Sequence, residues 1–179
     1  MKHILIPSRS VSQQKSATGF TLVEILVVIT IIGMLAGLGF PAIQGAMNAG
    51  KKAEVAAMAE SVKTAVNAFY AEYSAYPSNS GTTDANFLSL LSTTNTTSGN
   101  TRGIAFLEVP PKFTNQSGLV TPAGFYKGGG RSNFSINIDT NGTGQLTNKV
   151  GSSTYTVPAS VSVWVSDPQN ANKPVGTFK

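Results

Sequence analysis

The sequence predicts an α+β protein in which a long N-terminal helix, over about residues 20–76, packs on a small C-terminal antiparallel sheet. Three observations predict this fold. An uncharged apolar stretch runs from Ile25 to Gly50, and apolar residues at helical spacing continue it to Tyr76. The rest of the chain is rich in Ser, Thr, Asn and Gly, and two of its segments alternate apolar and polar residues as strands do. The 179 residues suit one domain with an appendage.

Composition argues against several classes of protein. The chain has no cysteine, which excludes disulfides, a thiolate metal site and a cysteine nucleophile, and its single histidine, His3, argues against a Ser-His-Asp site. The net charge of +5 owes much to Lys2, Arg9 and Lys15, which lie among the first 19 residues. The remaining chain holds 10 basic and 8 acidic residues, so we do not expect a nucleic-acid partner.

The apolar stretch is long enough to cross a membrane, because about 20 apolar residues span the bilayer core as a helix. Its densest part is Ile25–Phe40. The basic leader before it predicts a cytoplasmic N-terminus, and Lys51 and Lys52 on the other side weaken that bias slightly. A secretory signal would have a shorter apolar core followed by an A-x-A-like cleavage site, and the sequence has neither feature.

One acid, Glu24, lies in this apolar region. A charged side chain deep in a membrane helix costs about 2.5–3.5 kcal/mol or more unless it is paired. Two interpretations follow. In the first, Glu24 lies at the interface and reaches out to the headgroups. In the second, it has a specific cationic partner.

The residues around Glu24 favour the second interpretation. The segment GFTLVE, from Gly19 to Glu24, follows a short basic leader and begins the apolar helix. It resembles the processing site of type IV pilins and type II secretion pseudopilins. The resemblance implies that a membrane peptidase cleaves after Gly19, that Phe20 becomes N-methylated, and that Glu24 is the fifth residue of the mature chain. A small residue before the cut lets the backbone approach the peptidase closely.

Cleavage would also create the missing cation. The Phe20 nitrogen would change from an amide into an amine with a pKa near 8, mostly protonated at neutral pH. Phe20 and Glu24 are four residues apart, so they can pair within one chain. The resemblance implies pairing between neighbouring chains during filament assembly. The start of the helix also favours an anion at Glu24.

Three further residues of the apolar helix are expected to serve assembly. Gly33 and Gly37 have the GxxxG spacing that allows helices to approach closely in membranes, although glycine is also simply common there. Pro41 cannot donate to the carbonyl of Gly37, so the sequence predicts a kink near Pro41. The resemblance adds that this stretch bends or unwinds in assembled filaments.

The second half of the helix needs an apolar partner from the C-terminal region. Pro77, followed by a stretch rich in Ser and Gly, predicts that the helix ends near Tyr76. We interpret the aromatic residues near this end, including Tyr70, as core rather than as a ligand cage. The apolar stripe follows one face at steps of three or four residues: Val55, Met58, Val62, Val66, Phe69, Tyr73 and Tyr76.

The C-terminal region is expected to supply a small sheet. The patterns predict a short helix over 87–91, an irregular strand over 104–109, half-buried strands over 134–138 and 161–165, one strand within 144–157 and a polar loop over 167–179.

Several smaller patterns leave their interpretation open. Asp139 begins a loop with the opening spacing of a calcium site, but Val150 stands where the bidentate glutamate belongs. A hairpin turn at Asn141-Gly142 explains the loop better, and we predict no cofactor and no metal site, with calcium a lesser alternative.

Trp164 is either a contact point for a partner or a cover for the sheet. Lys127 and Arg131 flank three glycines in a predicted flexible loop.

The resemblance implies three regions: a cytoplasmic prepilin leader over 1–19, a transmembrane and filament-core helix over 20–50, and a periplasmic or extracellular head over 51–179. It implies a structural subunit of a type II secretion pseudopilus or type IV pilus-like filament, anchored in the inner membrane. The implied partners are other copies of the chain, the prepilin peptidase and methyltransferase, the inner-membrane assembly platform, minor pilins and the lipid bilayer. The absence of cysteine differs from many type IVa pilins and favours a major pseudopilin.

Two other classes of function predict different features of the head. A DNA-uptake or adhesive minor pilin, acting as a binding module, predicts clustered lysines or aromatic residues on the head, and these are scattered in the sequence. A membrane-anchored enzyme predicts converging acids in the head, where the acids after residue 77 are Asp84, Glu108, Asp139 and Asp167. We therefore expect no enzymatic activity and no catalytic residue.

Overall fold

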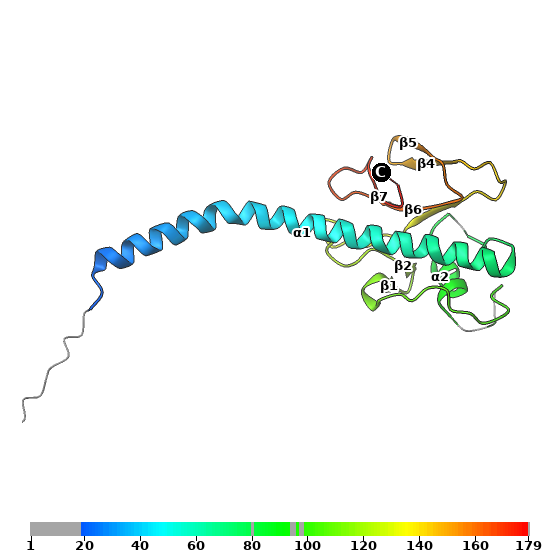
Figure 1. Ribbon diagram of the computed structural model, residues 1–179, viewed down its shortest axis with the longest axis horizontal. Coiled ribbons are helices and arrows are strands. Elements are labelled where there is room, and N and C mark those ends of the chain that lie inside the picture. Colours follow the sequence, from blue (N-terminus) through cyan, green and yellow to red (C-terminus); the bar gives the residue numbers. More distant parts are fainter. Residues whose placement is uncertain (1–18, 80, 94–95, 97–98, 179) are drawn as a thin grey trace, which may run out of the picture. The chain divides into compact units, whose positions relative to one another are not determined.

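The computed structural model describes residues 19–178, apart from 80, 94–95 and 97–98 (Figure 1). The chain divides into two compact units between Ile43 and Gln44. The basic leader, with Lys2, Arg9 and Lys15, lies outside the described residues, as does His3.

The first helix, α1, runs from Leu22 to Tyr73 and belongs to both units. It confirms the long helix predicted over about residues 20–76, with ends two and three residues inside the predicted ones. The helix is unbroken at Pro41, and the kink expected there stays a prediction.

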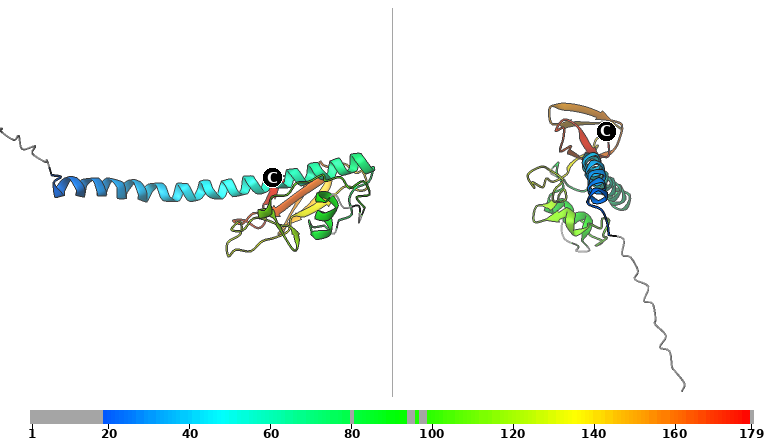
Figure 2. Two further views of the ribbon diagram at one scale, coloured as in Figure 1. Left: turned by 90° about the horizontal axis from the view of Figure 1, so that it is seen from below. Right: turned by 90° about the vertical axis from the view of Figure 1, so that its left-hand side faces the viewer.

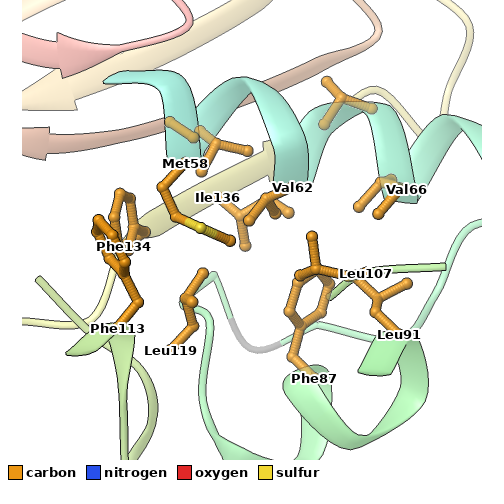
Figure 3. Close-up of a cluster of buried hydrophobic side chains, with 14 of the residues drawn as sticks. Met58, Val62, Val66, Phe87, Leu91, Leu107, Phe113, Leu119, Phe134 and Ile136 are labelled. Atoms are coloured by element: carbon orange, nitrogen blue, oxygen red, sulfur yellow. The ribbon is translucent and has the colours of Figure 1, made fainter. Parts of the chain in front are cut away.

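In the second unit, α1 buries one face in the main core. Seven of its residues are at most 6% exposed: Val55, Met58, Ala59, Val62, Ala65, Val66 and Phe69. In Figure 3, Met58, Val62 and Val66 of α1 face Phe87 and Leu107 from other parts of the head. The predicted apolar stripe is therefore confirmed as far as Phe69, and the small residues Ala59 and Ala65 widen it. Tyr73 and Tyr76 are half-buried against the same core. The interpretation of Tyr70 as core was wrong, because its side chain is 45% exposed and stacks on Tyr76 at the edge of the core.

The end of α1 differs from the prediction by three residues. Tyr73 is the last helical residue because Ser74 adopts a left-handed conformation, with φ of 52°, and its N–H donates to the carbonyl of Tyr70 at 2.8 Å. This is the geometry in which a residue just past a helix satisfies one of its last carbonyls. Ser74 therefore ends α1 three residues before Pro77.

Helix α2, Ala85–Ser92, confirms the predicted short helix and is capped by Asp84, whose carboxylate accepts the Phe87 N–H at 2.8 Å. The irregular strand predicted over 104–109 was wrong. Residues 104–109 belong to no strand, and the Phe106 and Leu107 N–H groups both donate to the Leu91 carbonyl, near the end of α2. A 3₁₀ turn, Pro111–Phe113, then leads into the two-residue strands β1, Thr114–Asn115, and β2, Gly118–Leu119, which pair antiparallel.

The main sheet has three antiparallel strands in the order β3-β6-β7. Strands β3, Ser135–Ile138, and β6, Val161–Ser166, lie where the alternating segments were predicted. Strand β7, Pro174–Gly176, was predicted as loop, and it pairs with β6 because Val175 belongs to the main core. In the left view of Figure 2 these strands and α2 lie on one side of the second half of α1.

A separate hairpin consists of β4, Leu146–Val150, and β5, Ser153–Val157. One strand was predicted within 144–157, and the structure has two. The hairpin predicted at Asn141-Gly142 was also wrong, because β3 pairs with β6 and β4 pairs with β5. Those two residues lie in a connection between two sheets.

Strand β6 is buried on both faces, although its alternation predicts one polar face. Ser162 and Trp164 are 0% and 8% exposed, because Trp164 packs in a second apolar cluster with Val150 and Phe178. The Trp164 and Phe178 rings meet edge to face at 5.5 Å. Trp164 therefore covers the sheet as core, and the alternative of an exposed contact point was wrong.

Candidate functional site: a capped helix start at an apolar surface

The start of α1 is held by hydrogen bonds between Thr21 and Glu24. The Thr21 N–H and hydroxyl donate to Glu24 Oε2 at 2.7 and 2.8 Å, and the Glu24 N–H donates back to the Thr21 hydroxyl at 3.2 Å. This reciprocal arrangement is a capping box, which satisfies N–H groups that the first turn of a helix leaves without partners. Glu24 thus has a structural role before any cation is present.

The predicted cleavage bond lies just before this cap. Gly19 and Phe20 are exposed and non-helical, and Phe20 exposes 83% of its surface. A Cβ placed on Gly19 would meet no atom within 4 Å, so nothing in the described chain crowds the bond. An exposed bond outside a helix is accessible to a peptidase.

The capping box places the Glu24 carboxylate one residue from the nitrogen that cleavage would free. Its oxygen is already hydrogen-bonded to the backbone N–H of Thr21, the residue that follows Phe20. Among the residues that the structure describes, Glu24 forms no ion pair. The cap therefore holds the Glu24 carboxylate at the residue next to Phe20.

Beyond the cap, α1 presents an apolar surface. Every large apolar side chain of α1 from Leu22 to Met47 is exposed, with Val27 the least exposed at 48%. A Cβ on Gly33 or Gly37 would meet nothing within 4 Å, so this small-residue face is open. Within the described residues, α1 is the one helix long and apolar enough to cross a membrane.

The head's acids serve the fold in several places. Asp84 caps α2, and Asp167 Oδ2 accepts a hydrogen bond from Lys52 Nζ at 2.8 Å. Asp139 accepts the Thr143 hydroxyl and the Gly144 N–H, at 3.1 and 2.6 Å. The described residues contain no group of three His, Cys, Asp or Glu side chains that could hold a metal ion.

Hydrogen bonding lowers the pKa of Asp139. Backbone N–H groups, foremost that of Thr143, stabilise the charged carboxylate more than burial disfavours it. Both carboxylate oxygens are thus used within the turn itself.

The capping box is a feature that the sequence analysis missed. Its signal is present as Thr21-x-x-Glu24, the Ser/Thr-x-x-Glu pattern that marks helix starts.

The capped apolar helix and the small antiparallel sheets that follow it make an α+β arrangement consistent with a pilin-like fold. Residues 14–40 match the family model described as the prokaryotic N-terminal methylation motif. The chain thus carries the signature of type IV pilin-like prepilins, the substrates of prepilin peptidase, and its apolar helix suits a membrane-anchored pilin. No curated protein and no solved structure matches the chain.

Proposed function

We propose that the chain is a structural subunit of a type II secretion pseudopilus or a similar disulfide-free pilus-like filament. The precursor is cleaved between Gly19 and Phe20, and the new amine of Phe20 is methylated. The apolar half of α1 anchors the chain in the inner membrane, with its N-terminus cytoplasmic and its head periplasmic. It then packs against the same helix of other copies.

One observation carries this proposal: a methylation motif lies at the start of a helix whose large apolar side chains are all exposed from Leu22 to Met47. A lipid bilayer covers such a surface in the monomer, and neighbouring helices cover it in a filament. Because lipid is as apolar as the helices, close packing and specific polar contacts must favour the exchange. Gly33 and Gly37 supply an open face for packing, and Glu24 supplies the polar contact.

Processing and assembly are linked through charge. In the precursor the Phe20 nitrogen is a neutral amide, so Glu24 has only the hydrogen bonds of its cap. Cleavage converts that nitrogen into an amine, which remains able to carry a proton after methylation. An uncleaved chain lacks this cation and is a poor partner, which restricts assembly to processed subunits. The chain needs no catalytic site for this role.

The experiment is co-expression with a prepilin peptidase, followed by intact mass and N-terminal sequencing of the protein from membranes. We expect a chain that begins at N-methylated Phe20. A chain that retains Met1–Gly19 in the presence of an active peptidase contradicts the processing step. With an assembly platform present, the same protein is expected in sheared filaments, and its exclusion from them contradicts the structural role.

A further inference from the structure

The head carries a cluster of lysines where the apolar part of α1 ends. Lys51 and Lys52, on α1, and Lys127, 75 residues later than Lys52 in the sequence, line one hollow of about 100 Å³. The polar residues Asn48 and Gln169 line the same hollow. We call Lys51, Lys52 and Lys127 the helix-exit cluster.

The fold holds two of these amines in place and leaves positive charge in excess. Lys51 Nζ donates to the Gly124 carbonyl at 3.0 Å, a neutral acceptor. Lys52 Nζ donates to Asp167 at 2.8 Å, which compensates its charge. Lys127 is exposed and has no hydrogen-bond or ion-pair partner among the residues that the structure describes. The hollow therefore has a net charge of about +2 when Asp167 is counted.

Chain connectivity places this cluster at a membrane surface. Lys51 directly follows the uncharged stretch Ile25–Gly50, whose 26 residues make about 39 Å of helix. The hydrocarbon core is about 30 Å thick, and the bilayer with its headgroups about 40–45 Å. In a chain anchored by this helix, Lys51 lies among or next to the headgroups of the leaflet on the head side.

Membrane orientation does not explain these lysines. Basic residues near a span favour the cytoplasmic side, so Lys51 and Lys52 oppose the orientation that the leader favours. Once the leader is removed, the basic residues nearest to the span are those on the head side. Three lysines that line one hollow are suited to phosphate oxygens, because each ammonium offers several donors and a full charge.

We propose that the helix-exit cluster binds the phosphate groups of anionic phospholipids in the leaflet next to the head. The proposal rests on the membrane anchoring in the proposed function, but not on filament assembly. Its consequence is a head held against the membrane surface before assembly, with an anionic lipid that must be released when the subunit leaves the bilayer.

The test is native mass spectrometry of the full mature chain in detergent, titrated with phosphatidylglycerol or phosphatidylcholine of the same acyl chains. We expect tighter binding of phosphatidylglycerol. A lysine near an anionic surface contributes about fivefold, so the double variant K51Q/K127Q is expected to lose about 25-fold in phosphatidylglycerol affinity. The control K149Q removes the same kind of charge from an exposed position on β4 and is expected to bind as the wild type does.

Each other outcome overturns the proposal. Unchanged phosphatidylglycerol affinity in K51Q/K127Q shows that the cluster does not bind it, and an equal loss in K149Q shows unspecific attraction. Equal affinity for inorganic phosphate assigns the hollow to a free anion. K127Q alone is expected to lose about fivefold and guards against unfolding, because Lys127 has no partner in the described fold. The readout uses the unassembled chain, so failed filament assembly and failed lipid binding are separate results.

Discussion

Lys52 Nζ lies 2.8 Å from Asp167 Oδ2 and joins the part of α1 that enters the head to the loop before β7, across 115 residues of sequence. Burial of Asp167 raises its pKa, but the hydrogen bonds from Lys52, Gln169 and Asn170 and the Lys52 charge outweigh burial, so the pKa is below its ordinary value. The contact is partly buried, with the two side chains 28% and 12% exposed.

This pair predicts a pH dependence of the head's stability. The folded-state pKa of Asp167 is lowered, so its contribution is present above the unfolded pKa of about 3.9 and is lost as the pH falls through the folded value. D167N is expected to cost about 1–3 kcal/mol at pH 7 and to make the stability less sensitive to pH below about 5. The measurement is thermal unfolding of the full chain in detergent, followed by the fluorescence of buried Trp164.

A surface pair serves as the control. Glu60 and Lys63 are 3.7 Å apart on α1, with side chains 53% and 31% exposed, so E60Q is expected to cost at most about 1 kcal/mol. Equal losses in D167N and E60Q would contradict the role given to the Lys52 contact.

The charge and the cap of Glu24 can be separated by two variants. E24Q keeps a side-chain acceptor for Thr21 but removes the anion, so membrane insertion is expected to remain and filament yield to fall at least tenfold. T21A keeps the anion and loses the cap hydroxyl, at a cost of about 1 kcal/mol in helix stability, with filament yield within a few fold of wild type. Quantitative blotting of membrane and sheared-filament fractions measures both. Wild-type yield from E24Q would remove the charge from the assembly mechanism.

Gly19 offers a substitution that the chain itself tolerates. A Cβ there meets no atom within 4 Å, so G19L is expected to leave the described fold and its Trp164 fluorescence unchanged. Cleavage by the peptidase is expected to stop, because the enzyme needs a close approach to the backbone before Phe20. A time course of precursor and mature bands, with A17L as the matched leader control, checks this. Cleavage of G19L at the wild-type rate would contradict the proposed cleavage position.

Glycine is required at position 118 for two reasons, its backbone conformation and the space around it. Its φ is +108°, and a Cβ would lie 2.3 Å from the backbone carbon of Asp84, the residue that caps α2. G118A is expected to cost about 3 kcal/mol or more, because backbone must move. Gly142 also has positive φ, +67°, but open space around it, so G142A is expected to cost about 1 kcal/mol. Chemical denaturation of both variants measures the free energy of unfolding, and the difference between them is the steric cost at Gly118. Equal costs in G118A and G142A would contradict the steric clash with Asp84.

At Ser74 a glycine is expected to stabilise the fold. It adopts a left-handed conformation, with φ of 52°, just after α1. S74G is expected to raise the free energy of unfolding by about 0.5–1 kcal/mol, because glycine adopts this conformation without strain. S74A, which keeps the Cβ, is the control and is expected to give no gain. A lower melting temperature for S74G would contradict this account of the helix end.

The sequence was most informative where the spacing of apolar residues within a single helix or strand shows which face is buried. The spacing of Val55, Met58, Val62 and Val66 identified the buried face of α1, and the alternation of Phe134, Ile136 and Ile138 identified β3. Thr21 and Glu24 also carry a local signal, the Thr-x-x-Glu pattern of a capped helix start.

Other features depend on segments that meet only in the folded chain. Trp164 alternates with buried valines and so resembles an outward residue, but Val150 and Phe178 cover it from elsewhere in the chain. The pairing of β3 with β6 rather than with β4 likewise follows from which strands complete the core. Lys127 joins Lys51 across 76 residues, and no local pattern marks that meeting.

The residues that pack on the buried face of α1 in the head are synthesised late. Its buried stripe begins at Val55, and the main core is complete only with Val175 of β7. At about 5–20 residues per second, about 6–24 s separate the making of these two residues. For that interval the stripe is an apolar surface on an unfinished chain. The head is therefore most open to aggregation before β7 is made, and variants that weaken β6–β7 pairing should reduce the yield of protein more than its final stability suggests.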